Sequence, residues 1–227
     1  MKKRLAKTVL FATGGLLFYS IAATAIYKKT LLVQTSCREG VALTFDDGPH
    51  PIYTPQLLDL LKEFDIHATF FVVGKQAQAY PAIIKRMHEE GHTIGIHHYQ
   101  HTSNWLMLPQ KVKKEIEQCA QIIEQITGER PTLYRPPWGH LNVCVPMLAK
   151  PYRIVLWTRH FTDWRIACIQ HTLEADLVEA AKAESILLLH DNGQTLGADE
   201  NAPKYMLEHL ASYLRKHAHT TKFVTLR

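Results

Sequence analysis

Cysteine is scarce in this sequence. Four cysteines occur among 227 residues, and none belongs to a C-x-x-C pair. The missing pairs argue against a zinc ribbon and a thioredoxin-type redox site, and four cysteines are too few for a disulfide-scaffolded domain. The sequence leaves two alternatives for Cys37, Cys119, Cys144 and Cys168: they form one or two disulfides, or they are unpaired buried thiols.

Acidic residues are absent from positions 1–29, which carry six lysines and arginines. Of the 26 basic residues in the chain, 20 are left for positions 30–227, against 21 acidic ones. The net charge of +5 therefore comes from the N-terminal segment. Because the remainder lacks the basic excess of a nucleic-acid-binding surface, we expect no nucleic-acid partner. The sequence indicates no obligate protein partner either.

The N-terminus holds a long uncharged run. Twenty residues, Thr8–Tyr27, carry no charge and have basic residues on both sides. As a helix they would extend about 30 Å, the thickness of a bilayer core. The run exceeds the apolar region of about 7–15 residues in a signal peptide, although Ala23-Thr24-Ala25 fits a cleavage site.

Residues 1–36 are therefore predicted to be a membrane anchor or signal segment with a short linker, and residues 37–227 the folded domain. A transmembrane anchor, a cleaved signal and, less well supported, a buried core helix all fit the run. The first two place the domain outside the cytoplasm, either anchored to the cell membrane or secreted. No motif lies in 1–36, so this segment is expected to determine location and not chemistry.

After Tyr27, short apolar runs alternate with longer amphipathic stretches. Such alternation predicts a mostly parallel α/β sheet with helices outside it, and seven units could close into a barrel. The predicted strands are Val41–Phe45, Ala68–Val73, Thr93–His97, Thr132–Arg135, Arg153–Trp157, Ile186–His190 and Lys222–Leu226. The predicted helices are Pro55–Phe64, Ala77–Glu90, Pro109–Thr127, Leu173–Lys182 and Ala202–His217.

Polar residues gather where these strands end. In a parallel α/β barrel, reactive residues lie at the carboxyl ends of the strands. The candidates at those positions are Asp46, Asp47, His97, His98, His101, Arg135, Asp163 and His190. Their convergence is the main functional signal in the chain.

Each cluster alone also has a plain structural interpretation, such as a turn, a surface histidine pair or a rigid loop. Two histidines four positions apart and one aspartate would make a three-ligand metal site with open positions, as in catalytic sites. The prolines after Arg135 could aim a backbone N–H near Trp138 at an oxyanion. His190 could be a general acid if a carboxylate such as Asp163 held it.

Together the clusters resemble the five motifs of NodB-type polysaccharide deacetylases, carbohydrate esterase family four. They occur in the family's order, and the resemblance covers about residues 38–227. The matching runs are Thr44–Pro49, His97 with His101, Arg135–Gly139, Asp163-Trp164, and Leu188 with His190. The resemblance implies a distorted (β/α) barrel of about seven parallel strands and a metal-dependent hydrolase that removes N-acetyl groups from amino sugars.

The resemblance also implies a role for each site residue. A divalent metal, most often zinc, with cobalt, nickel or manganese as alternatives, would be held by Asp47, His97 and His101. Asp46 would be the general base, paired with Arg135. The backbone N–H of Trp138 would face the oxyanion, and Leu188 would border the substrate. His190, oriented by Asp163, would protonate the leaving amine.

Two positions depart from the family pattern. His98 stands where the second motif has Ser or Thr, and a shifted metal ligand is one interpretation of it. His160 stands where the fourth motif begins with Asp. The expected substrate is an N-acetylated glycan, either peptidoglycan or a chitin-like oligosaccharide. The alternatives are an O-acetyl esterase on another polysaccharide and a non-catalytic glycan-binding wall protein.

Overall fold

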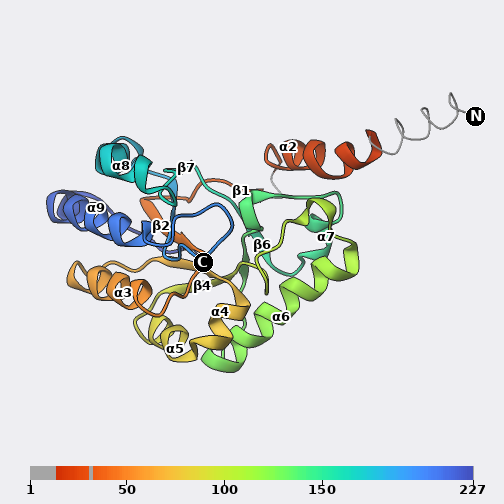
Figure 1. Ribbon diagram of the computed structural model, residues 1–227, viewed down its shortest axis with the longest axis horizontal. Helices are drawn as coiled ribbons and strands as arrows, with labels where there is room; N and C mark the ends of the chain where they lie inside the picture. The colour runs from red at the N-terminus through yellow and green to blue at the C-terminus, as the bar shows by residue number, and fades with distance from the viewer. Residues whose placement is uncertain (1–13, 31–32, 227) are drawn as a thin grey trace, which may run out of the picture.

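The computed structural model describes residues 14–30 and 33–226, and Figure 1 shows their arrangement. Eight strands form one sheet in the order β1-β6-β5-β4-β3-β2-β8-β7, and every pairing is parallel. The strands are β1 (Val33–Gln34), β2 (Val41–Asp46), β3 (Thr69–Val72), β4 (Thr93–Ile96), β5 (Leu133–Tyr134), β6 (Arg153–Val155), β7 (Arg159–His160) and β8 (Ser185–His190).

The predicted α/β class and parallel sheet are confirmed, and the barrel is only partly formed. The sheet is a curved half-barrel whose edge strands, β1 and β7, do not pair with each other in the described part of the chain. Residues 156–158 run from β6 to β7 and so connect the two sides of the sheet covalently. Leu156 N–H donates to the carbonyl of Gln34, and Thr158 N–H donates to that of Ile186.

Six of the seven predicted strands are present within one or two residues. The seventh, at Lys222–Leu226, forms a single bridge, between Phe223 and Val41. The structure adds β1 and β7, which are only two residues long and too short to show an alternating pattern. β1 lies inside the segment predicted to be anchor and linker, where Val33 pairs with Ile154.

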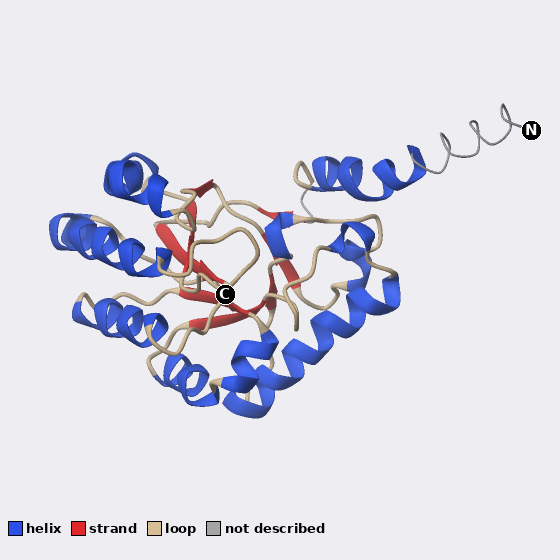
Figure 2. Cartoon of the chain, in the orientation of Figure 1, coloured by secondary structure: helices blue, strands red, loops and turns tan. Residues whose placement is uncertain are grey.

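Helices cover the outer side of the sheet, as Figure 2 shows. The longer ones are α3 (Tyr53–Glu63), α4 (Gly74–Ala79), α5 (Pro81–Glu89), α6 (Pro109–Thr127), α8 (Ile166–Ala180) and α9 (Ala202–His217). Short elements are η2 (Asn104–Leu106), η3 (Pro137–Gly139), α7 (Val145–Leu148) and η4 (Ala218–Thr220). The helix predicted over Ala77–Glu90 is wrong in one respect, because it breaks between Tyr80 and Pro81. Proline disfavours a helical residue before it, and Tyr80 has φ −129° and ψ 58°.

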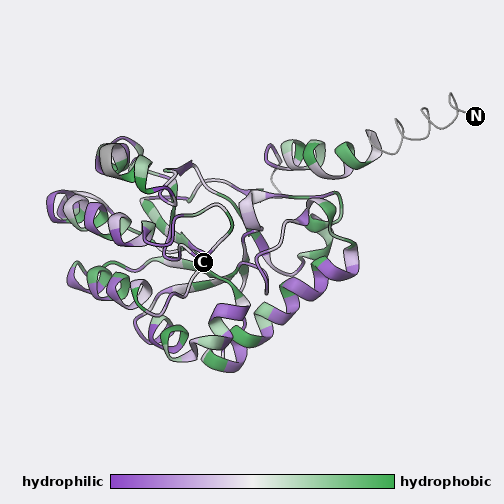
Figure 3. Ribbon diagram, in the orientation of Figure 1, coloured by the Kyte–Doolittle hydropathy of each residue, from purple (hydrophilic) through white to green (hydrophobic). Residues whose placement is uncertain are grey.

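Amphipathic patterning fixes how the helices pack. In α6 the face toward the sheet carries Val112, Ile116, Cys119 and Ile123, all buried, whereas Lys113 is exposed. Figure 3 shows this division of hydropathy along the helix. Burying such a stripe supplies most of the stability of a surface helix.

The N-terminal residues that the structure describes form a helix beside the domain, continuous through residues 14–17, η1 (Phe18–Ala22) and α2 (Ala23–Tyr27). Within the described residues, none of the helices has the length and apolar character needed to cross a membrane. The first part of the predicted Thr8–Tyr27 span lies outside the described residues. The four cysteines have free thiols.

Candidate active site

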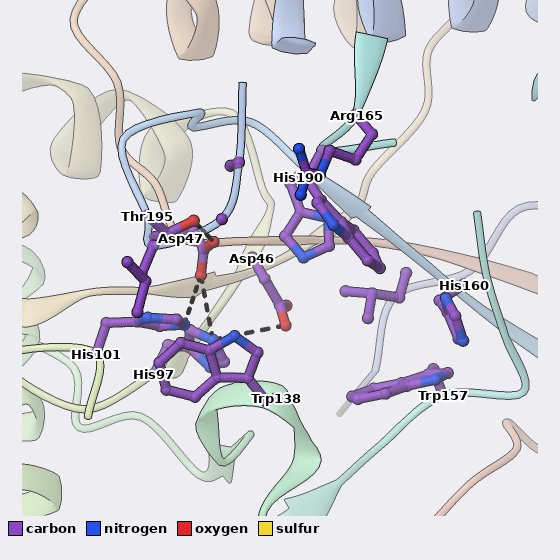
Figure 4. Close-up of a pocket in the computed structure, with 15 residues that line it drawn as sticks. Asp46, Asp47, His97, His101, Trp138, Trp157, His160, Arg165, His190 and Thr195 are labelled. Carbon is purple, nitrogen blue, oxygen red and sulfur yellow. Dashed lines mark hydrogen bonds and ion pairs between the residues drawn. The ribbon is translucent and has the colours of Figure 1, made fainter. Parts of the chain in front are cut away.

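The predicted site residues lie together around one cavity of about 440 Å³ at the carboxyl ends of the strands. Figure 4 shows how they face one another across it. Its lining includes Asp46, Asp47, His97, His101, Trp138, Leu188 and His190 from the sequence prediction, together with Trp157, His160, Trp164, Arg165 and the loop residues Thr195–Ala198. Arg135 and Asp163 lie directly behind this lining and are fully buried.

Asp47, His97 and His101 form a compact cluster in which one ligand atom from each lies within 4.8 Å of the others. The Nε2 atoms of His97 and His101 lie 3.3 and 3.0 Å from Oδ1 of Asp47. His97 Nδ1 donates to the carbonyl of Arg135 at 2.7 Å. That bond fixes the tautomer and leaves the Nε2 lone pair directed into the cluster.

This cluster fits a divalent cation. Oδ1 of Asp47 is buried and has no hydrogen-bond partner among the described residues other than its close contacts with the two imidazoles. Burial opposes the charged carboxylate, but the charge and contacts of His101 and His97 outweigh it and hold the pKa of Asp47 well below its ordinary value. An ionised carboxylate and two imidazole nitrogens are the donor set of catalytic zinc sites.

Asp46 lies next to this cluster but has a different partner. Its Oδ1 accepts from Nη1 of Arg135 at 2.7 Å, and its Oδ2 is 3.7 Å from Nε2 of His97. Arg135 is wholly buried and also donates to Thr44, Val155 and Leu156. The guanidinium therefore holds one carboxylate oxygen and leaves the other facing the cavity.

His190 ends β8 beside Asp46, its aligned partner in β2, and lines the same cavity (Figure 4). Its Nδ1 donates to Oδ1 of Asp163 at 2.9 Å, and its backbone N–H donates to Oδ2 at 2.6 Å. Burial alone would lower the pKa of His190, but the charge of Asp163 and the bond to it raise this pKa to about 9. The imidazole is therefore a proton donor at neutral pH.

Trp138 occupies a strained turn at the rim. In η3 it adopts φ 54° and ψ 13°, a left-handed conformation that is rare for a bulky residue. Backbone N–H groups in the first turn of a helix lack intrahelical acceptors. The Trp138 ring lies 4.3 Å from the His101 ring, measured between centroids. Non-glycine residues in this conformation cluster at functional sites, and Asp47, His98 and His101 share it here.

His98 does not join the metal cluster, which decides the alternative that the sequence left open. Its Nδ1 donates to the carbonyl of Thr102 at 2.9 Å, and its Nε2 accepts from the Tyr134 hydroxyl at 2.7 Å. Burial, together with the nearby His97, lowers the pKa of His98 to about 3. His98 is thus a neutral, buried brace of the loop that carries His101.

Several supporting residues escaped the sequence analysis. Thr195 donates to Oδ2 of Asp47 at 2.9 Å, and Asn192 donates to the Asp47 carbonyl at 3.3 Å. Glu115, buried in α6, accepts from the backbone N–H of Tyr99 and of Gln100 and so holds the histidine loop. Asn192 and Thr195 closely follow His190 in the sequence, but none of the three residues carries a distinctive spacing.

Asp191 explains the glycine of the first motif. A Cβ on Gly48 would clash with the buried Asp191 carboxylate, so any larger residue there would have to displace that carboxylate. Asp191 is buried, which raises its pKa to about 7, and it accepts from the Thr54 hydroxyl. The Asp-Asp-Gly sequence is therefore fixed by packing as well as by chemistry.

An aromatic wall borders the side of the cavity opposite the histidine cluster. The His160 ring stacks against Trp164 at 5.9 Å and meets Trp157 edge-on at 6.2 Å between centroids. Trp164 in turn contacts His190 edge-on at 5.2 Å. Burial, opposed by the charge of Asp163, lowers the pKa of His160, so this ring is neutral at physiological pH.

The fold thus brings a carboxylate paired with a buried arginine, a cluster that could hold a metal ion and an ion-paired histidine around one cavity. A sequence profile described as polysaccharide deacetylase matches residues 34–154. The chain belongs to the polysaccharide deacetylase family and is a hydrolase of that family.

Named relatives are peptidoglycan deacetylases. A peptidoglycan-N-acetylglucosamine deacetylase of Bacillus cereus is 39% identical over 157 residues, which cover 67% of this chain and 73% of the relative. The peptidoglycan-N-acetylmuramic acid deacetylase PdaC of Bacillus subtilis is 38% identical over 151 residues, 66% of this chain but only 32% of PdaC.

Solved structures agree with the fold. The Bc1960 peptidoglycan N-acetylglucosamine deacetylase superposes with a TM-score of 0.77 at 29% identity, covering 86% of this chain and 91% of that one. PdaC from Bacillus subtilis superposes with a TM-score of 0.73 at 32% identity, covering 83% and 88%.

Proposed function

We propose that this protein removes N-acetyl groups from the amino sugars of peptidoglycan and releases acetate. The observation that carries the proposal is the convergence on one cavity of the neighbouring Asp46 and His190, the three-ligand cluster and the Trp138 turn. The names of the relatives point to peptidoglycan as the glycan. A chitin-like oligosaccharide would present the same N-acetyl group.

Amide hydrolysis needs a nucleophile, an oxyanion partner and a proton for the leaving nitrogen. A divalent metal, zinc by the donor set, would be held by Asp47, His97 and His101, and when bound it polarises the acetyl carbonyl and lowers the pKa of water. The remaining requirements fall on side chains and backbone of this chain.

Asp46 takes the proton from the attacking water. Arg135 holds Oδ1 in a charge-assisted bond, so Oδ2 stays fixed toward the cavity. The Trp138 N–H would donate to the acetyl oxygen as negative charge develops there, and such a donor acts without reorganising because its turn is already formed.

His190 gives its proton to the departing amine. The ion pair with Asp163 keeps the imidazole charged and fixes its orientation, with Nδ1 toward Asp163 and Nε2 left for the substrate. Trp157, Trp164 and Leu188 offer apolar surface on which the sugar ring lies while its acetamido group enters the site.

The proposed location is outside the cytoplasm, at the membrane. The support is the uncharged sequence Thr8–Tyr27 with its basic flanks and a substrate that lies in the cell wall. Cell fractionation of the full chain tests it, and recovery in the cytoplasmic fraction would contradict it.

The deciding experiment measures acetate release from purified peptidoglycan and from an N-acetylglucosamine oligomer. We expect release that a chelator abolishes and zinc restores, with the Asp46→Asn protein as the control for contaminating activity. Binding of the glycan without acetate release would instead establish the glycan-binding alternative, and release only from an O-acetylated polysaccharide would establish the esterase alternative.

A further inference from the structure

The N-terminal helix is hydrogen-bonded to the rest of the domain, and the central contact is the hydroxyl of Thr24. Thr24 is buried, and its Oγ1 lies 2.6 Å from the Leu141 carbonyl, 3.0 Å from the Leu141 N–H and 3.0 Å from Nε1 of Trp105. A hydroxyl donates one hydrogen bond and accepts two. Thr24 therefore accepts from two loops of the domain, while its single proton faces the Leu141 carbonyl at 2.6 Å and the Ser20 carbonyl of its own helix at 3.1 Å.

Further bonds lie on the same face of the helix. The Tyr19 hydroxyl donates to the Met107 carbonyl at 3.0 Å, and the Val143 N–H donates to the Tyr19 carbonyl at 3.0 Å. The opposite face is apolar and open, with Phe18 61% and Ile26 52% exposed. A surface helix ordinarily buries its apolar face. This one is held by hydrogen bonds to loop residues instead.

The loops that it holds lead to the active site through stacked rings. Trp105, which donates to Thr24, stacks on His140 with 3.6 Å between centroids and 14° between planes. His140 lies 5.8 Å from Trp138, and Trp138 lies 4.3 Å from His101. The helix is thus connected by three ring contacts to the proposed oxyanion turn and to a proposed metal ligand.

We propose that the helix is a retained part of the catalytic domain and that Thr24 is a positioning residue for the Trp138 turn. The acceptor on Thr24 fixes the indole of Trp105, the indole supports His140, and His140 supports a turn that is strained at φ 54°. The proposal rests on the proposed function, because the turn carries the oxyanion donor. It replaces the expectation that the N-terminal segment determines location alone.

Retention has a direct consequence for processing. The cleavage sequence Ala23-Thr24-Ala25 lies inside this contact, with Ala23 and Thr24 buried. Cleavage there would leave the Trp105 indole and the Leu141 N–H without their acceptor. The mature protein should therefore keep the helix. Mass spectrometry of the intact protein tests this, and a fully active protein whose mass shows that the first 25 residues are missing would overturn the proposal.

The test uses the full chain in detergent micelles and three variants. Thr24→Val keeps the shape and removes the hydroxyl, Thr24→Ser keeps the hydroxyl, and Thr172→Val makes the same change on the exposed side of α8. We expect Thr24→Val to lower kcat roughly tenfold with little change in KM, since a displaced oxyanion donor acts on the transition state. Thr24→Ser should restore kcat, and Thr172→Val should match the unchanged protein.

A second readout does not depend on activity. The near-ultraviolet circular dichroism of the stacked Trp105 should change in Thr24→Val and not in the other two variants. Unchanged kcat and an unchanged tryptophan signal in Thr24→Val would overturn the proposal.

Hydrogen exchange of the unchanged protein decides the case if Thr24→Val fails to fold. The amides of Leu141 and Val143, which donate to the helix, should be protected. Exchange at the rate of an open loop would show that the helix is not docked. If the unchanged protein releases no acetate, the proposed function fails, while the exchange and dichroism experiments still test the docking.

Discussion

Two adjacent aspartates have different partners, and the different tasks proposed for them rest on this difference. Asp46 ends β2 and pairs with the buried Arg135, whereas Asp47 turns into a left-handed conformation and faces two histidines. The strand ends at Asp46 and the backbone turns at Asp47, so the two carboxylates have different surroundings. One carboxylate can therefore serve as base while the other, a few ångströms away, is available as a metal ligand.

Asp46→Asn should keep the fold and metal binding and lose most activity. Asparagine has nearly the same shape and can still accept from Arg135, but it cannot take a proton. A general base contributes about 10²–10⁴-fold, so kcat should fall within that range. Turnover and zinc content measured on one preparation check this, and full turnover at full occupancy would mean that another group is the base.

Asp163→Asn should lower turnover at neutral pH by at least about tenfold and move the basic limb of the pH profile to lower pH. The Asp163 charge raises the pKa of His190 to about 9, so the imidazolium is present below that pH and is lost above it. Without this charge, burial alone lowers the same pKa. The pH dependence of kcat checks it, with Asp176→Asn on α8 as control.

For single residues, the sequence predicts the proposed catalytic and metal-binding residues better than the residues that hydrogen-bond to them and fix their positions. The motif spacing placed Asp47, His97 and His101 in one cluster, as the structure has them. It left His98 ambiguous, because only the positions of Thr102 and Tyr134 show that both ring nitrogens are engaged. Thr195 gave no signal, since its bond to Asp47 joins positions 148 residues apart.

Arg135 acts at the scale of the elements, because it joins three strands. It follows β5, and its guanidinium bonds to Thr44 and Asp46 of β2 and to the carbonyls of Val155 and Leu156 at the end of β6. It also lies 4.0 Å from the ring centroid of Phe71. The carboxyl ends of these strands are thus fixed from the centre of the sheet.

Arg135→Met should destabilise the protein by about 3–5 kcal/mol, because it leaves Asp46 buried without its partner. Urea denaturation monitored by circular dichroism measures this change in unfolding free energy. Adding Asp46→Asn to the same protein should recover part of the loss, since the unpaired charge is then removed. Equal loss in the single and double variants would assign the effect to packing alone.

His160→Asp tests the short strand β7, where the family pattern is altered. His160 is neutral, so it cannot supply the charge that an aspartate would. A carboxylate there should raise the pKa of His190 further, leave turnover at neutral pH unchanged or higher, and move the basic limb of the pH profile upward. If Asp163→Asn has no effect while His160→Ala abolishes turnover, the two roles are assigned wrongly.

Element prediction failed where the local signal is short or interrupted. The period of α6 covers 19 residues, and its predicted bounds are confirmed. The helix predicted through Pro81 breaks because proline restricts Tyr80. β1 and β7 have two residues each, and both exist only because longer strands beside them, β6 and β8, supply partners.

For the whole molecule, the half-barrel brings together groups that are widely separated in the chain. Asp46 and His190 are aligned partners in neighbouring strands, β2 and β8. Parallel pairing puts the carboxyl ends of all strands at one edge, so residues following different strands meet there. The sequence could predict this edge from strand order alone, but not which loops would cover it.

Metal binding should stabilise the whole fold, because the ligands come from separate elements and converge only when the protein is folded. A ligand present at about 100 times its Kd adds about 2.7 kcal/mol to the unfolding free energy. For a chain of this size that corresponds to a rise in Tm of roughly 5–10 °C.

Calorimetry of the chelator-treated protein, before and after one equivalent of zinc and then excess zinc, measures this rise. Asp47→Ala should abolish it, because the carboxylate ligand is lost, whereas Asp46→Asn should keep it. A rise in Asp47→Ala equal to that of the unchanged protein would place the bound zinc elsewhere. A rise lost in both variants would mean that Asp46 also holds the metal, and its role as a separate base would fail.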